Sequence, residues 1–354
     1  MDNLNERIDA LINDFVPKKI KGMTVSVSKG NEFLYLKSVG VIEELNFKFT
    51  NDTIYDLASL TKPLVTSLLI LKLIEIGKIS LWDTIDELDL FHEFKNIRKF
   101  SIENLLTHTT GLPPDRPLYK EGKTKEAYLK FIDRESSYII PGKREIYSDL
   151  NYIILGFIIE EIYGKTLDKV WNNVISDPLD LKNSFFNPNV DIKRIAPSEY
   201  SEERGLLWGK VNDEKAYYLG GVAGNAGLFS NIYDINKILY SFVSGNLVSK
   251  RTVEIATTNR NTHLGGIFGL GWMIKSEKKE IRSESYNYTG FLGDLSPNGT
   301  FGHTGFTGTS ICVNKEKNIF CVILSNSTYP KRDGKGEIIR FRRLFHNIIF
   351  SILG

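Results

Sequence analysis

Apolar residues recur at helical spacing close to both ends of the chain. The opening segment MDNLNERIDALINDF predicts an amphipathic helix. Its apolar face would consist of Leu4, Ile8, Leu11, Ile12 and Phe15. The closing segment EIIRFRRLFHNIIFSIL (337–353) predicts a second helix of this kind, whose arginine residues should form a solvated face opposite an apolar stripe.

Short runs rich in β-branched residues lie next to these helices in the sequence. MTVSVSKG (23–30) and EFLYLKSVG (32–40) predict a β-hairpin with its turn at Lys29, Gly30 and Asn31. Glycine-rich turns and β-like runs return after residue 218. They are GIFGLGWMI (266–274), GTSICVN (308–314) and IFCVILSN (319–326).

Helical patterns dominate the region between the two groups of strands. An apolar helix is expected from about Leu60 to Ile76, ending at Gly77. Further helices are expected within 101–108, 124–134 and 149–164. We therefore expect an α/β (α+β) fold, in which an antiparallel sheet flanked by helices is built from both termini. Residues 1–80 and 206–354 would form the sheet domain and 81–205 an inserted, mostly helical domain, with the active site between them.

The composition is that of an ordinary soluble globular protein. Its 354 residues are 42% hydrophobic and 25% charged, and the net charge of +2 gives no basic footprint for nucleic acid. The N-terminus lacks a charged-then-apolar signal, and no uncharged apolar stretch approaches the 18 residues of a membrane span. We therefore expect a cytoplasmic protein that binds neither nucleic acid nor membrane.

The two cysteine residues, Cys312 and Cys321, flank a polar turn in SICVNKEKNIFCVIL. A turn centred between Glu316 and Lys317 would place them directly opposite each other on neighbouring strands. A disulfide between them is then possible, although a one-residue change of register removes the alignment. Reduced thiols are favoured, because cytosolic chains rarely keep disulfides.

Three Ser-x-x-Lys pairs occur, and their predicted surroundings differ. Ser26 and Lys29 lie in a strand, where residues three apart point to opposite faces, and Ser276 and Lys279 lie in a polar surface run. Only the pair Ser59 and Lys62 falls where a helix begins, in YDLASLTKPLVT. Residues three apart on a helix share a face, so this pair can interact.

The start of a helix suits a nucleophilic serine. Backbone N–H groups and the positive end of the helix dipole favour the negative charge that develops on Ser59. If desolvation lowers the pKa of Lys62, its neutral amine can accept the serine proton. The alternative is a solvated lysine at a helix end. No other catalytic template is present, and the five histidine residues lack metal-ligand spacing, so neither a metal nor a cofactor is expected.

Two more stretches extend this hypothesis. Tyr147-Ser148-Asp149 leads into an apolar helix, and His303-Thr304-Gly305 opens a predicted strand. With Ser59-x-x-Lys62 in front of them, the sequence resembles the serine β-lactamase and penicillin-binding-protein superfamily in its class C-like branch. That branch includes esterases, D-aminopeptidases and D,D-peptidases. LLTHTTGLP (105–113) and GGVAGNAGLFS (220–230) extend the resemblance over nearly the whole chain.

The resemblance implies a role for each matching residue. Ser59 would be the nucleophile, Lys62 its proton acceptor, and Tyr147 a second acid/base with a lowered pKa. The remaining matches would bind substrate. They are Asp149, and the edge strand His303, Thr304 and Gly305 with the following Phe306. The oxyanion hole would use the backbone N–H groups of Ser59 and Phe306.

Two positions depart from the pattern common among β-lactamases of this branch. His303 stands where many carry lysine, which should weaken recognition of a substrate carboxylate. Asp149 stands where asparagine is common; an ionised Asp149 can only accept hydrogen bonds, and pairing with Lys62 would raise the lysine pKa. The glycine residues of 220–230 are interpreted as allowing close packing beside the active-site strand, and His108 and Ser148 as structural.

These observations predict a serine hydrolase that forms an acyl-enzyme on Ser59 and acts on a small ester or amide without a cofactor. Esterase activity is favoured over a D-amino-acid peptidase or amidase, and over weak β-lactam turnover. A non-catalytic relative that binds a ligand in the same cleft is the alternative of another class. Loops 112–125, 200–218 and 280–300 would form the pocket walls; the substrate and the oligomeric state are open.

Overall fold

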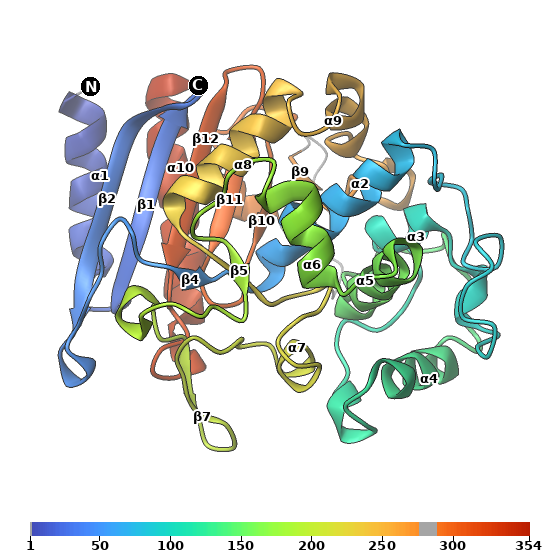
Figure 1. Ribbon diagram of the computed structural model, residues 1–354. Coiled ribbons are helices and arrows are strands. Elements are labelled where there is room, and N and C mark those ends of the chain that lie inside the picture. The colour runs from blue at the N-terminus through green and yellow to red at the C-terminus, as the bar shows by residue number, and fades with distance from the viewer. Residues whose placement is uncertain (1, 276–288) are drawn as a thin grey trace.

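The computed structural model describes residues 2–275 and 289–354, so the Ser276/Lys279 pair and part of the predicted loop 280–300 lie outside it. Its centre is a seven-stranded sheet in the order β3-β2-β1-β12-β11-β10-β9 (Figure 1). All neighbouring strands in it are antiparallel. The strands are β1 (Gly22–Lys29), β2 (Glu32–Ile42), β3 (Phe47–Lys48), β9 (Met273–Ile274), β10 (Phe301–Thr304), β11 (Ser310–Asn314) and β12 (Ile319–Ser325).

The middle of the sheet joins the two ends of the chain. Strand β1 pairs with β2 on one side, through the predicted hairpin, and with β12 on the other, where Met23 lies opposite Ser325. Gly30 adopts φ +60° at the hairpin turn, a conformation that glycine accepts without steric cost. The predicted antiparallel sheet built from both termini is therefore confirmed.

The register of the last hairpin also follows the prediction. Cys312 lies directly opposite Cys321 on the paired strands β11 and β12. Both cysteines are free thiols buried in the sheet. Burial raises the pKa of the Cys312 thiol, and the neighbouring Cys321 adds to this effect.

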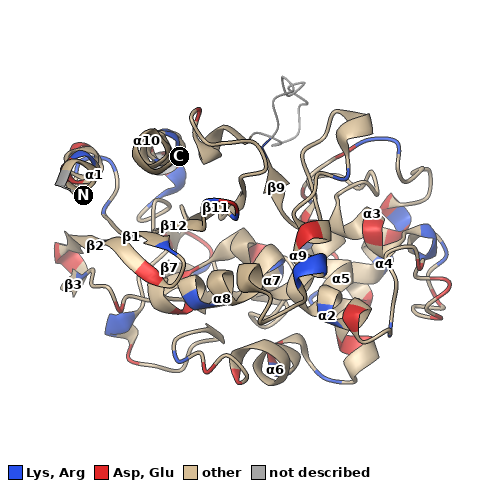
Figure 2. Ribbon diagram, turned by 90° about the horizontal axis from the view of Figure 1, so that it is seen from above, with Lys and Arg blue, Asp and Glu red and all other residues tan. Residues whose placement is uncertain are grey.

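Helices cover both faces of the sheet. Helix α1 (Asp2–Phe15) and helix α10 (Lys335–Leu353) lie side by side on one face, while α8 (Ile232–Ser244) packs against β1 and β12 on the other (Figure 2). The five apolar residues predicted for the N-terminal helix are all buried. The prediction for the C-terminal helix was wrong at one position: Arg342 is only 5% exposed, because it lies on the apolar side of α10 together with Ile338 and Phe345.

The remaining elements lie mostly beside the sheet. The segment around Ser59 begins with a 3-10 turn (Ala58–Leu60) and a π-helical segment (Lys62–Ser67) that continues into α2, in place of one regular helix from Leu60 to Ile76. The other α-helices of the described residues are α2 (Leu68–Glu75), α3 (Ile102–Leu106), α4 (Lys125–Glu135), α5 (Asp149–Tyr163), α6 (Leu167–Trp171), α7 (Glu214–Tyr218) and α9 (Lys250–Ala256). Short strands complete the fold: β4 (Tyr55–Asp56), β8 (Leu228–Ser230) and β5 (Phe185–Phe186) form one sheet, and β6 (Glu199–Ser201) and β7 (Gly205–Leu207) another.

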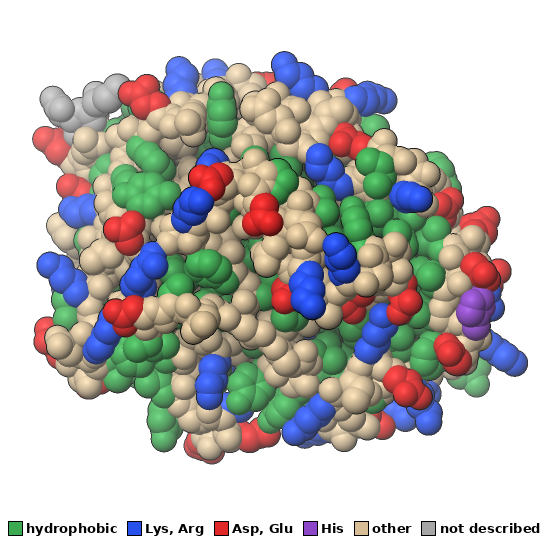
Figure 3. All heavy atoms as spheres, viewed as in Figure 1, with side chains coloured by type: hydrophobic (Ala, Val, Ile, Leu, Met, Phe, Trp, Pro, Cys, Tyr) green, Lys and Arg blue, Asp and Glu red, His purple; other side chains and the backbone are tan. Residues whose placement is uncertain are grey.

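Both signs of charge are interspersed on the face shown in Figure 3, with apolar side chains between them. In the part of the chain that the structure describes, no helix is both long and apolar enough to cross a membrane. The cytoplasmic location stays a prediction.

The glycine-rich stretch 220–230 packs closely against α5. A Cβ added to Gly224 would lie 2.0 Å from the carbonyl oxygen of Tyr152 and 2.9 Å from the nitrogen of Gly156. The tight packing predicted for this stretch is present, and at Gly224 its neighbour is α5 rather than the strand that carries His303. The next residues of the stretch reach the site, so this approach helps to place them.

We expect Gly224→Ala to lower the free energy of unfolding by about 1–3 kcal/mol, because backbone atoms must move to admit the methyl group. Urea unfolding followed by circular dichroism would measure the change. Gly77→Ala is the matched control: Gly77 has φ +67° and no atom within 4 Å of an added Cβ, so it should lose only the ~1 kcal/mol of the left-handed conformation. Equal stability of Gly224→Ala and the wild type would contradict the close-packing argument.

Candidate active site

Ser59 lies in the 3-10 turn directly after β4. The preceding Ala58 adopts φ +47°, a conformation rare for residues with a side chain. Asp56 stabilises this turn: its Oδ1 accepts a hydrogen bond from the N–H of Ala58 at 2.8 Å. From the loop after β10, Thr307 Oγ1 donates to the Asp56 carbonyl (2.7 Å) and Thr309 Oγ1 to the Leu57 carbonyl (3.0 Å). The segment that carries Ser59 is thereby fastened to the loop between β10 and β11.

Lys62 is fully buried one helical turn after Ser59, and its ammonium group meets three oxygen atoms. Its Nζ lies 2.8 Å from Ser59 Oγ, 2.8 Å from Asp149 Oδ1 and 3.2 Å from the carbonyl oxygen of Asn225. An ammonium group has three protons to donate, so these three acceptors satisfy it. Ser59 and Lys62 are therefore brought together as predicted, and the lysine is not solvated.

Asp149 decides the charge state of this lysine. Burial lowers the pKa of Lys62, but the Asp149 carboxylate and Tyr147 outweigh burial and raise the pKa above its ordinary value. The sequence left open whether desolvation or pairing with Asp149 would prevail, and pairing prevails. At neutral pH the resting site therefore contains a Lys62 ammonium.

Tyr147 lies beside both residues. The Lys62 ammonium is 4.9 Å from the centre of the Tyr147 ring, and the phenol hydroxyl is within hydrogen-bonding reach of Lys62 and Ser59. Burial raises the pKa of Tyr147, and the lysine cation only partly offsets this effect. The predicted lowering of the tyrosine pKa was wrong, because a single nearby cation shared with Asp149 does not compensate for burial.

Asp149 is held between two cations. Its second oxygen, Oδ2, lies 3.1 Å from Nζ of Lys215 on α7. The two lysines hold the pKa of Asp149 far below its usual value, although burial opposes them. Lys215 also pairs with Asp115 (2.6 Å) and Asp213 (3.2 Å). Asp149 therefore remains ionised, where an asparagine would be neutral.

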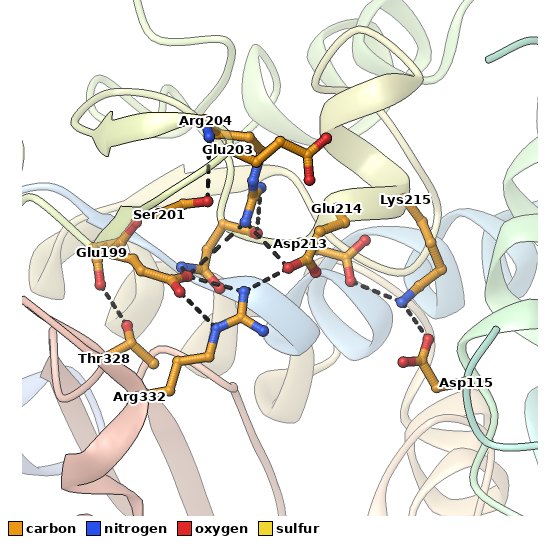
Figure 4. A network of polar contacts seen from close by, with 12 residues as sticks. Asp115, Glu199, Ser201, Glu203, Arg204, Asp213, Glu214, Lys215, Thr328 and Arg332 are labelled. Carbon is orange, nitrogen blue, oxygen red and sulfur yellow. Dashed lines mark hydrogen bonds and ion pairs between the residues drawn. The ribbon is translucent and has the colours of Figure 1, made fainter. Parts of the chain in front are cut away.

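Figure 4 shows how the charges next to Lys215 continue into a second group. Arg332 Nε lies 2.7 Å from one oxygen of Glu199, and its Nη2 lies 2.5 Å from Glu214. Arg204 joins the same carboxylates, at 3.2 Å from Glu214 and 3.9 Å from Glu199. Lys215, Arg204 and Arg332 thus each have carboxylate partners.

His303 lies in β10 facing the ring of Tyr147, with ring centres 5.9 Å apart. The strand begins two residues before the predicted start. The Nδ1–H group of His303 donates to the carbonyl of Thr304 (2.9 Å), and Nε2 has no partner among the described residues. Burial, with Lys62 adding to it, lowers the pKa of His303 to about 3. His303 is therefore neutral at physiological pH and supplies no cation to the site.

A cavity of about 430 Å³ opens in front of Ser59. Tyr147, Asp149, Thr304, Gly305 and Phe306 all line it, so the structure brings the predicted site residues to one place apart from Lys62 and His303, which lie buried behind them. The rest of the cavity wall has an apolar part and a charged part. The apolar part contains Met273, Phe291, Ile338 and Ile339. The charged part contains Asp115, Asp213, Glu214, Lys215, Arg332 and Arg342.

Two residues predicted to be structural support the start of α5. His108 Nδ1 accepts a hydrogen bond from the N–H of Ser148 at 3.1 Å, and its ring packs on Tyr147 with centres 4.7 Å apart. The Ser148 hydroxyl accepts from the N–H of Leu150 and donates to the carbonyl of Pro113. Through these contacts, His108 and Ser148 hold Tyr147 and Asp149 in place at the start of α5.

Sequence reasoning missed four residues that shape this site: Asp56, Lys215, Asn225 and Arg342. Asn225 contributes through its backbone carbonyl, which any residue type would offer, so no sequence signal existed. Arg342 did have a sequence signal, because its position continues the helical spacing of the apolar residues in the last helix. In the described ranges, no group of three or more histidine, cysteine or acidic residues is arranged to hold a metal ion.

The family model described as Beta-lactamase matches residues 8–342, nearly the whole chain. This protein belongs to the beta-lactamase family. A relative from Escherichia coli K12, named "Putative D-alanyl-D-alanine carboxypeptidase", is 31% identical over 373 residues, which cover 93% of this chain and 83% of the relative. The assignment of Ser59-x-x-Lys62, Tyr147-Ser148-Asp149 and His303-Thr304-Gly305 as the signatures of this family stays a prediction.

Solved structures support the fold of this beta-lactamase family member. EstCE1, a hydrolase with promiscuous acyltransferase activity, has a TM-score of 0.77 at 20% identity and covers 98% of this chain and 99% of its own. The D-amino acid amidase of Ochrobactrum anthropi SV3 has a TM-score of 0.71 at 19% identity, covering 96% and 97%. At such identities the likeness concerns the fold alone.

The neutral state of His303 predicts a pH-dependent contribution to stability. An unfolded chain binds a proton at this residue below pH ~6.5, whereas the folded protein does so only near pH 3, so stability falls as the pH falls. At pH 5 this difference amounts to about 2 kcal/mol. In His303→Asn, which keeps a donor near the Nδ1 position, the loss of stability between pH 7 and pH 5 should shrink by that amount. Urea unfolding at both pH values measures it, and an unchanged difference would contradict a neutral His303.

Proposed function

We propose that this protein is a serine hydrolase that forms an acyl-enzyme on Ser59 and hydrolyses a small ester or amide, with esters as the favoured substrates. The observation that carries the proposal is the contact of 2.8 Å between Lys62 Nζ and Ser59 Oγ at the edge of the cavity, with the Tyr147 hydroxyl next to both. A nucleophile, a proton-accepting group and space for a substrate therefore coincide.

The chemistry follows from the proton balance of the site. Loss of one proton from the pair Lys62 and Tyr147 creates the base that receives the Ser59 hydroxyl proton. Ser59 Oγ then bonds to the substrate carbonyl carbon, and the N–H groups of Ser59 and Phe306 stabilise the negative oxygen. The pair returns the proton to the leaving alcohol or amine as the carbon–leaving-group bond breaks. A water molecule then gives a proton to the pair and bonds to the acyl carbon. The bond to Ser59 Oγ breaks, the acid product leaves, and the pair returns the proton to Ser59.

An ester without a carboxylate suits the cavity best. His303 is neutral, and the cations Lys215 and Arg332 already have carboxylate partners. Arg342 donates to two backbone carbonyl oxygens. The apolar wall at Met273 and Phe291 can receive a hydrocarbon group.

A D-amino-acid amidase or peptidase is the second candidate, and weak β-lactam turnover the third. Asp115 supports the second, because its side chain is 71% exposed on the cavity wall and can pair with a substrate ammonium group. The name of the Escherichia coli relative and the fold of the D-amino acid amidase are consistent with this candidate.

Exposure to a fluorophosphonate should add one adduct to the wild-type protein, and peptide mapping should place it on Ser59. Intact-mass spectrometry measures the adduct. Ser59→Ala should remain unmodified, and Ser26→Ala, which changes a buried serine in β1 outside the cavity, should react like the wild type. Absence of an adduct, or an adduct that persists in Ser59→Ala, would refute the mechanism. The non-catalytic ligand-binding alternative would then be favoured.

The ester hydrolysis rate should rise with pH, because Asp149 raises the pKa of Lys62 and the base form appears only as the site loses a proton. In Asp149→Asn the rising limb of kcat/KM should move to lower pH by about one to two units, since one opposing charge is gone. Because Lys62 and Tyr147 titrate together, the limb reports the pair. In the control Asp115→Asn, which removes a carboxylate from Lys215 but none from Lys62, the midpoint should stay in place. A limb that does not move in Asp149→Asn would contradict this role of Asp149.

A further inference from the structure

Arg342 is a buried cation on the wall of the cavity that has no carboxylate partner among the described residues. Arg342 as a whole is 5% exposed, and its guanidinium extends from α10 toward the turn between β10 and β11. Nη2 donates to the carbonyl oxygens of Gly305 (3.1 Å) and Thr309 (2.8 Å), and Nε has no partner in the described chain. Buried charges are normally paired with an opposite charge, so its placement here calls for a reason.

One acceptor of Arg342 belongs to the peptide between Gly305 and Phe306. The carbonyl of Gly305 belongs to the same peptide unit as the N–H of Phe306, the group proposed above to stabilise the oxyanion. This peptide is trans, so its C=O and N–H bonds point in opposite directions. A cation bound to the carbonyl therefore lies on the side away from the substrate oxygen.

Arg342 also closes the turn that carries this peptide. Thr309 O accepts from both Gly305 N (2.7 Å) and Arg342, and the N–H of Gly308 donates to Gly305 O at 3.1 Å. The Gly305 carbonyl thus has two donors, one of them charged. A positive charge on a carbonyl oxygen draws electron density from the amide and makes its N–H a stronger donor.

We propose that Arg342 is a positioning residue, which orients and polarises the Gly305–Phe306 peptide so that its N–H group stabilises the oxyanion. This inference rests on the proposed function, because it assigns Arg342 a part in acylation and deacylation of Ser59. Burial lowers the pKa of Arg342 to about 9, so the guanidinium is still charged at neutral pH. The arginine needs no substrate contact for this role.

The test compares Arg342→Gln, Arg342→Lys and the control Arg340→Gln, which removes an equal charge from an exposed position of the same helix. Two esters serve as substrates, one neutral and one bearing a carboxylate. Losing an oxyanion donor typically costs 10²–10³ in rate, so weakening one should lower kcat of Arg342→Gln by roughly 10-fold or more for both esters, with little change in KM. Arg342→Lys should recover part of the loss, and Arg340→Gln should match the wild type.

The infrared carbonyl band of an acyl-enzyme provides a readout that a purely structural role would not move. With a ¹³C-labelled, slowly hydrolysed acyl group on Ser59, the band of Arg342→Gln should shift to higher wavenumber than that of the wild type, because the hydrogen bonds to the carbonyl oxygen weaken. Thermal unfolding shows whether each variant is folded. If Arg342→Gln does not fold, the same comparison is made with Arg342→Lys, whose smaller cation should give a shift of the same sign.

Three results would overturn the inference while leaving the proposed function intact. They are an unchanged band, a kcat of Arg342→Gln equal to that of Arg340→Gln, and a loss confined to the KM of the carboxylate ester, which would indicate direct substrate binding. Failure of the wild-type protein to form an acyl-enzyme on Ser59 would instead refute the proposed function, and with it this role of Arg342.

Discussion

The buried ammonium group of Lys62 is the constraint on which the site depends. Its three acceptors come from three segments: Ser59 from the turn after β4, Asp149 from the start of α5, and Asn225 from the glycine-rich stretch. An ammonium group buried without such partners would cost several kcal/mol. The charge is tolerated only when all three segments are in place, so folding and the geometry around Ser59 rest on the same contacts.

The ion pair between Lys62 and Asp149 stabilises the resting site but lowers the fraction of Lys62 that is neutral. Asp149 compensates the buried charge of Lys62, and for the same reason it disfavours the neutral amine that would accept a proton. Lys215 moderates the conflict, because it shares the Asp149 carboxylate from the other side. Asp149 is thus accompanied by a second lysine, Lys215. This ion pair occupies the place where a neutral asparagine would otherwise stand.

Much of the fold was predictable because periodic patterns depend on local sequence. The hairpin of β1 and β2, the register of Cys312 against Cys321 and the helices at both ends follow from alternation or helical spacing alone. Ser59, Lys62 and Tyr147 could be predicted to lie together because three short motifs stand in a recognisable order.

The electrostatics were not predictable in the same way. The pKa of Lys62 depends on the balance between burial and Asp149, and that balance depends on a distance between residues 87 positions apart in the chain. Lys215 carries no motif at all, because its partners are set by how α7 docks. Arg342 is the exception, since a charged residue on an apolar helical face is visible in the sequence, but only the structure reveals the two carbonyls that it binds.

The two sides of the cavity differ in how freely they can change. Met273 and Phe291 on the apolar wall are uncharged, so substitutions there can alter the substrate without changing the charges around Lys62 and Ser59. On the charged wall, Lys215 connects Asp115 to Asp149 and so to Lys62. A substitution of Lys215, which pairs directly with Asp149, changes the charged wall and the proton affinity of the site together. Divergence of substrate preference should therefore be easier along the apolar wall, where binding and catalysis are separable.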